Sequence, residues 1–243
     1  MKTINRFAFV ALLLGALTFT TACEKEDVDN PDTTEALTEE EAVVLVEASL
    51  ATETEGLAAE TMVAVSVTTD EANSTPIPCG ETQDSTYTFS RNGDYFTANY
   101  LTTLSWPPFC SNAGFLQSMS VSRTTDGSYS GNRISSVDSS TGTLTISNIL
   151  TGTAYVIDGT FTRSGSQTIE AMETRSVTTE TEFELADLNV NKGSRRIESG
   201  TATFTITGEN AQMQTFVIEG TVIFLGNGAA TVIINGNQYS IDL

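Results

Sequence analysis

The stretch TATFTIT, residues 201–207, alternates strictly between apolar residues and threonines. Ala202, Phe204 and Ile206 fall on one side of an extended chain, and the four threonines fall on the other. A period of two is typical of a strand with one buried and one solvated face. The stretches TLTIS at 143–147 and QYSIDL at 238–243 repeat the pattern.

Turn sequences separate such alternating stretches in the last two thirds of the chain. They include RNGD at 91–94, TDGS at 125–128 and NGN at 235–237, and Asn-Gly and Asp-Gly pairs suit tight hairpins because they tolerate positive φ. Residues 79–243 are therefore expected to form a mainly β domain of about ten strands. Its predicted architecture is an antiparallel meander, either a curled sheet or a closed barrel.

Two glycines interrupt the alternation in related positions. VIDGTF at 156–161 returns as VIEGTV at 217–222, and SGTA at 199–202 carries the same Gly-Thr pair. A glycine weakens a strand unless a bend or a close approach requires it. Gly200 and Gly220 are therefore predicted to lie nearly opposite each other on paired strands, on the concave face of the sheet.

Residues 38–68 change to a helical period. Thr38 and Glu41 have the spacing of a capping box, and Val43, Val46 and Leu50 recur at i, i+3 and i+7. A first helix should end before Gly56, and LAAETMVAV at 57–65 predicts a second short helix. This apolar stripe is expected to pack on the sheet.

The first 22 residues predict a secretory signal. Lys2 and Arg6 precede an uncharged apolar run at 7–19, which is too short to span a bilayer. Small residues and then Cys23 follow. This arrangement resembles the lipobox of bacterial lipoproteins, although Thr20 stands where that motif usually has leucine. The resemblance implies cleavage before Cys23 and a lipid attached to its thiol.

The sequence CEKED at 23–27 resembles the surface-export signal of Bacteroidota lipoproteins, in which a lysine and two acids follow the acylated cysteine. Lys25, Glu26 and Asp27 occupy those positions. The resemblance implies an outer-membrane, lipid-anchored protein on the cell surface. The remainder is similar to uncharacterised β-rich lipoproteins, which supply no activity. Residues 23–37 are rich in acids and predict an extended tether.

The composition excludes several kinds of function. The formal net charge of −20 disfavours nucleic acid as a partner, so the expected partner is the membrane, reached through the lipid, with a protein or glycan partner left open. The chain has no histidine, which removes the usual general base and metal ligand. No catalytic motif, metal or cofactor is predicted, and the protein is not expected to be an enzyme.

Three further features carry candidate sites. Cys79 and Cys110 would form a disulfide in an oxidising compartment, the alternative being free thiols or a metal site. Trp106 and Phe109, in SWPPFC at 105–110, form either a rigid binding loop or a plug at the end of the sheet. Asp158 and Glu219 each precede a glycine and would have to face each other to act as acid and base.

These observations predict a non-enzymatic binding or structural module of the cell envelope. The first alternative is a calycin-like barrel that carries a small apolar ligand, and the second is a hydrolase that relies on carboxylates alone. A filled interior would favour the module, an apolar cavity the carrier, and two facing carboxylates the hydrolase.

Overall fold

A computed structural model describes residues 36–73, 79–170 and 174–243. Two helices precede eleven strands, all in chain order. The helices are α1 (Glu39–Leu50) and α2 (Leu57–Asn73). The strands are β1 (Gln83–Asn92), β2 (Phe96–Trp106), β3 (Pro108–Cys110), β4 (Leu116–Gly131), β5 (Ile134–Ser147), β6 (Ala154–Ile169), β7 (Arg175–Asn191), β8 (Ile197–Asn210), β9 (Thr215–Gly226), β10 (Ala229–Ile234) and β11 (Asn237–Asp242).

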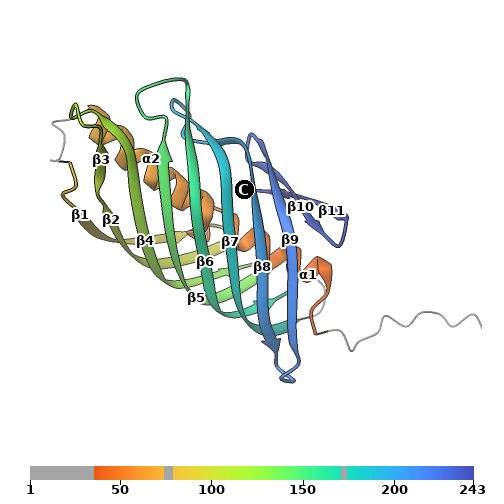
Figure 1. Ribbon diagram of the computed structural model, residues 1–243. Coiled ribbons are helices and arrows are strands. Elements are labelled where there is room, and N and C mark those ends of the chain that lie inside the picture. The colour runs from red at the N-terminus through yellow and green to blue at the C-terminus, as the bar shows by residue number, and fades with distance from the viewer. Residues whose placement is uncertain (1–35, 74–78, 171–173) are drawn as a thin grey trace, which may run out of the picture. The chain divides into compact units, whose positions relative to one another are not determined.

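The strands form one antiparallel meander, as the sequence predicts. Each strand pairs with its neighbour in the chain, except that β2 pairs directly with β4 and the short β3 pairs with β4 alone. The sheet curls but does not close, because β1 and β11 are its two edges and are not paired with each other. Of the two predicted architectures, the curled open sheet is therefore the one formed (Figure 1).

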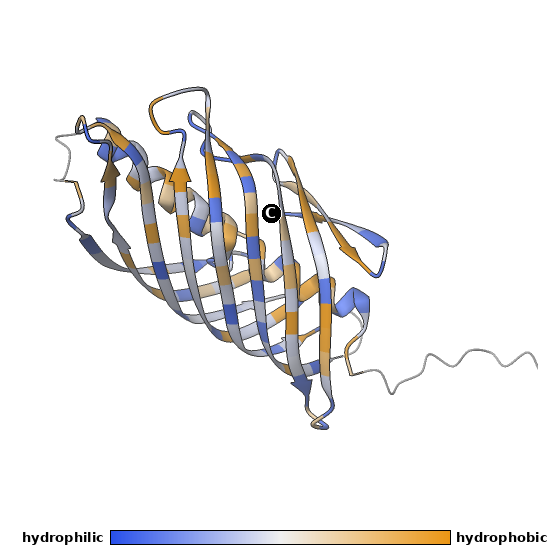
Figure 2. Cartoon of the chain, viewed as in Figure 1, coloured by the Kyte–Doolittle hydropathy of each residue, from blue (hydrophilic) through white to orange (hydrophobic). Residues whose placement is uncertain are grey.

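The helices lie against the concave face of this sheet (Figure 1). The core is made by side chains of α1 and α2 and by every second residue of the strands, including the row Phe161, Phe183 and Phe204 on neighbouring strands. The rings of this row have centroids 6.1 and 5.9 Å apart. Figure 2 shows the alternation as apolar and polar bands along the strands. The outward positions of β8 are the threonines of the TATFTIT stretch.

One of the predicted turns is wrong. TDGS at 125–128 lies inside β4, which runs without a break from Leu116 to Gly131. Gly127 has no positive φ and is instead in a close approach, since a Cβ atom there would overlap the main-chain oxygen of Asn99 on β2. Gly165 on β6 and Gly208 on β8 lie in the same cross-strand row and are equally crowded by neighbouring main chain. Glycine is therefore required along this row by the close approach of neighbouring main chain.

Gly200 and Gly220 both face the core, but they are not opposite each other. Gly220 pairs with Phe204 and Gly200 pairs with Phe224, so the register separates the two glycines by four residues. A Cβ atom at Gly220 would overlap the ring of Phe204, and one at Gly200 would overlap Leu188. Each glycine therefore makes room for a particular large neighbour.

The start of α1 follows the predicted capping box. The Thr38 hydroxyl accepts from the Glu41 N–H at 3.2 Å, and the Glu41 carboxylate accepts from the Thr38 N–H at 2.9 Å. The next residue, Glu39, links the helix to the C-terminal hairpin. Its carboxylate accepts hydrogen bonds of 2.7–2.9 Å from Asn235, Asn237 and Tyr239, which lower the pKa of Glu39.

Candidate functional site

The concave face holds a buried polar cluster between the sheet and the α1–α2 connection. We define this cluster as Glu55, Glu60, Tyr100, Arg123, Asp138 and Arg163. Its members come from the end of the connection, from α2 and from the adjacent strands β2, β4, β5 and β6. Arg123, Asp138 and Arg163 are ionisable residues at inward positions of their strands. All six side chains are buried.

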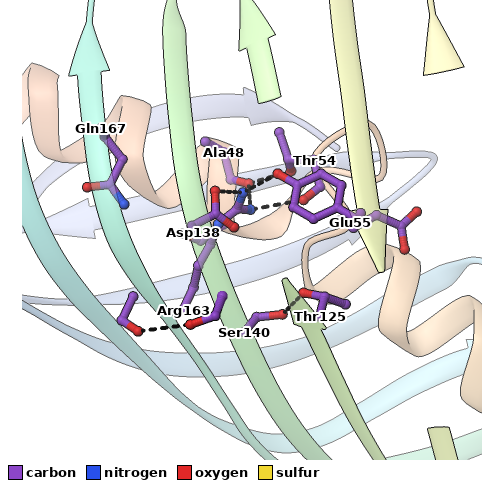
Figure 3. A network of polar contacts seen from close by, with 12 residues as sticks. Ala48, Thr54, Glu55, Thr125, Asp138, Ser140, Arg163 and Gln167 are labelled. Atoms are coloured by element: carbon purple, nitrogen blue, oxygen red, sulfur yellow. Dashed lines mark hydrogen bonds and ion pairs between the residues drawn. The ribbon is translucent and has the colours of Figure 1, made fainter. Parts of the chain in front are cut away.

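Arg163 ties the helical connection to three strands. Its guanidinium donates to the main-chain oxygens of Ala48 and Thr54 at 2.8 and 3.1 Å, and to the Tyr100 hydroxyl at 2.9 Å. It also forms an ion pair of 2.7 Å with Asp138 (Figure 3). Removing one partner of a buried pair leaves an uncompensated charge and typically costs about 3–5 kcal/mol. Burial, and to a smaller extent the charge of Asp138, raise the pKa of Tyr100 to about 12 against the pull of Arg163, so the hydroxyl keeps its proton.

Arg123 makes the second link between sheet and helices. It forms a buried ion pair with Glu55 and donates to the main-chain oxygen of Glu55 at 3.3 Å. Burial raises the pKa of Glu55 against the opposing attraction of Arg123. Glu55 itself has a positive φ of 54°, so the chain makes a left-handed step at the residue that the arginine holds.

Glu60 is the member whose carboxyl group makes no hydrogen bond in the described part of the chain. It is 1 % exposed, and neither carboxyl oxygen has a hydrogen-bond partner in the described part of the chain. The carboxyl group lies over Gly142, where a Cβ atom would overlap it, and Gly142 is paired with Arg123 on the next strand. Burial raises the pKa of Glu60 to about 8, against the pull of Arg123. The side chain is therefore protonated at neutral pH.

Arg123 and Arg163 hold the helices in place, and neither side chain is accessible to a substrate. Arg123 and Arg163 are 1 and 4 % exposed, and the depression between α1 and the sheet beside Arg163 has a volume of only about 10 Å³. That space is about the size of one water molecule. These residues are not among those predicted from the sequence, although the sequence contains a signal for them. Arg123 and Arg163 have the same parity as Val121 and Phe161, which fixes them on the inward face.

The predicted disulfide is confirmed. Cys79 and Cys110 are bonded, with Cα atoms 5.7 Å apart, and the N–H of Gly80 donates to the oxygen of Pro108 at 2.8 Å. Trp106 is half-buried against the core, and its indole N–H donates to Glu71 on α2 at 3.4 Å. Phe109 is 50 % exposed. The two aromatic residues therefore have different surroundings: Trp106 packs inward on α2, and Phe109 points to solvent.

Asp158 and Glu219 do not face each other. Both are exposed on the outer face, on β6 and β9, which are separated by β7 and β8. Three strand spacings amount to about 14 Å, more than the roughly 5–9.5 Å between the carboxyls of glycosidases. Asp158 instead accepts a hydrogen bond of 2.9 Å from the Asp187 N–H. The structure does not assemble an acid–base pair from these two carboxylates.

The remaining predicted site residues, Cys23, Lys25, Glu26 and Asp27, lie outside the described residues. Within the described ranges, no group of three or more acidic or cysteine side chains is placed to hold a metal ion. Neither α1 nor α2, the two helices of the described part, is long and apolar enough to cross a membrane. Comparison of the chain with protein-family models, with curated proteins and with solved structures finds no match.

Proposed function

We propose that this chain is an outer-membrane lipoprotein, displayed on the cell surface, whose β domain is a non-enzymatic binding or structural module. The observation that carries the second half of the proposal is the filled interior. The place where a calycin-like barrel would hold its ligand is taken by α1 and α2, which are tied to the sheet by Arg123 and Arg163. The strands form a scaffold around the chain's own helices.

The anchoring half of the proposal follows from the signal-like segment and Cys23. A single acyl chain gives only marginal membrane binding, whereas several chains anchor stably at about 0.8 kcal/mol for each buried methylene. An acidic tether at 23–37 would hold the folded domain away from an anionic membrane surface. The strongly negative charge of the chain fits a solvated protein that does not adhere to its surroundings.

The test of this proposal is a Cys23→Ser variant expressed in the native host. We expect the wild-type protein to sediment with outer membranes and to carry a mass increase from the attached lipid. The variant should lose both the lipid mass and the membrane association. Cys79→Ser with Cys110→Ser is the matched control, because it removes two cysteines and should leave lipidation intact. Membrane association that persists without Cys23 would contradict the proposal.

A further inference from the structure

The open seam of the sheet contains a second feature that the filled core does not explain. A half-open pocket of about 780 Å³ lies where β1, α2 and the β10–β11 edge approach one another. We call it the seam pocket. Its wall includes Met62 and Val63 of α2, Phe89 of β1 and Phe224 of β9. Met62 is 45 % exposed there, and the volume is within the range of about 300–1,000 Å³ typical of small-molecule sites.

The charge at the seam pocket is opposite to that of the whole chain. Arg91, Arg195 and Arg196 line it, in a protein whose formal net charge is −20. Every other arginine of the described chain forms an ion pair: Arg123 with Glu55, Arg133 with Glu47, Arg163 with Asp138 and Arg175 with Glu41. The arginines without an ion-paired carboxylate in that part of the chain are therefore the ones that meet at this pocket.

The acidic groups nearby do not neutralise these arginines. Glu55 also lines the pocket, but its carboxylate pairs with Arg123. Asp242 lies at the wall as well, and its carboxylate is not ion-paired with a described arginine. Since all other described arginines are neutralised, an anionic ligand would supply the missing partner here.

Two of the three guanidinium groups are positioned by contacts that leave other N–H groups available. Arg195 has a positive φ of 57° and donates to the Ser66 hydroxyl of α2 at 3.1 Å. The guanidinium of Arg91 stacks over the Phe96 ring, 5.3 Å from its centroid. An arginine fork binds a carboxylate or a phosphate through two parallel hydrogen bonds. The apolar wall supplies the surface for a hydrocarbon group next to that anion.

From this combination we infer that the seam pocket binds an amphiphilic anion, a hydrocarbon chain that ends in a carboxylate or phosphate. The hydrocarbon contacts Met62, Val63 and Phe224, and the anionic end meets Arg91, Arg195 and Arg196. The site lies at the gap between the sheet edges and not in the sheet interior. This inference specifies the binding side of the proposed function and is independent of the lipid anchor.

The test uses the full chain with Cys23→Ser, so that no acyl anchor is attached, and isothermal titration with four dodecyl compounds. They are dodecanoate, dodecyl phosphate, dodecanol and dodecyltrimethylammonium, all below their micelle concentrations. We expect both anions to bind at least tenfold more tightly than the alcohol and the cation. A preference between the two anions distinguishes a carboxylate ligand from a phosphate ligand. Equal binding of the cation would overturn the inference.

The decisive comparison is a triple variant, Arg91→Gln, Arg195→Gln and Arg196→Gln. It should bind dodecanoate at least tenfold more weakly and dodecanol unchanged. Because the apolar run at 7–19 can itself bind amphiphiles, the difference between the two chains is the measured quantity. Arg133→Gln, an arginine outside the pocket, is the matched control. Unchanged affinity in the triple variant, or an equal loss in the control, would overturn the inference.

Two further measurements keep the outcomes separate. Arg91→Gln with Arg196→Gln changes only exposed side chains, so it should melt like the wild type and still lose affinity for the anions. An acidic hexapeptide that binds more tightly than dodecanoate would mean a protein-docking site and would also overturn the inference. The anchor is absent from this assay, so failure here does not bear on the membrane association that Cys23→Ser tests.

Discussion

At the scale of single residues, Glu60 makes the folded state sensitive to pH. Its folded pKa of about 8 lies above the ordinary value of 4.5, so the folded chain binds a proton that the unfolded chain has already released. The contribution of Glu60 to the free energy of unfolding is therefore fully present below pH 4.5 and decreases as the pH rises toward 8. Between these values the loss is about 1.4 kcal/mol for each pH unit.

Glu60→Gln should remove this dependence, because an amide of the same shape does not titrate. We expect wild type and variant to be equally stable at pH 4, and the variant to be more stable by about 3 kcal/mol at pH 7. Urea melts at several pH values measure the difference. Glu219→Gln, on the outer face, is the control and should show no such trend. Parallel stability curves for Glu60→Gln and wild type would mean that the carboxyl is solvated.

Gly220 is the second residue with a testable energetic role. Valine suits a strand better than glycine in general, so propensity alone predicts that Gly220→Val stabilises the protein. Packing predicts the reverse, because a side chain there would overlap the Phe204 ring. Added volume in a packed core typically costs about 1–3 kcal/mol, and we expect packing to dominate. The denaturant midpoint should fall, whereas Thr203→Val on the outer face should not lower it.

At the scale of the elements, the features that could be predicted from the sequence are those determined by residues close together in the chain. Strand alternation, the RNGD and NGN turns and the capping box at Thr38 all depend on neighbours a few residues away, and all are found in the structure. The turn predicted at TDGS is wrong because Gly127 is required by the close approach of the β2 main chain. Local sequence does not specify that approach. The buried cluster was not predicted because its contacts join distant parts of the chain. Arg163, for example, donates to the main-chain oxygen of Ala48, which is 115 residues away. The alternation along β6 is a signal that puts Arg163 on the inward face, but it does not identify the residues that Arg163 contacts.

The disulfide is an element-scale feature because it fixes β3 and the segment before β1 to each other. Breaking a loop of this length costs about 3–4 kcal/mol in the chain-entropy model. We expect the double variant Cys79→Ala with Cys110→Ala to have a free energy of unfolding lower by about this amount. Intact mass before and after reduction should differ by two hydrogens in the wild type only. If reductant shifts the melts of both proteins equally, the disulfide is not the cause.

At the scale of the whole molecule, the export signal that the sequence resembles can be tested apart from the anchor. Replacing Lys25, Glu26 and Asp27 by alanine should leave a lipid-modified protein in the outer membrane. Protease added to intact cells should digest the wild type and spare the variant. Disrupted cells provide the control, in which both proteins should be cut equally. Equal digestion in intact cells would contradict a role for these three residues in surface display.

The meander topology also has a consequence for the order of folding. Each hairpin can form from strands that are adjacent in the chain, and local pairing of this kind proceeds quickly. The helices are synthesised before the strands, but α1 can complete its tertiary contacts only late. It is held by residues up to 200 positions later in the chain, as Glu39 is by Tyr239. If the chain is exported N-terminus first, as the proposed function requires, the contacts of Glu39 with the last hairpin form only after β10 and β11 have emerged. Until then α1 lacks the part of its packing that β10 and β11 supply, and incompletely packed apolar surface favours aggregation.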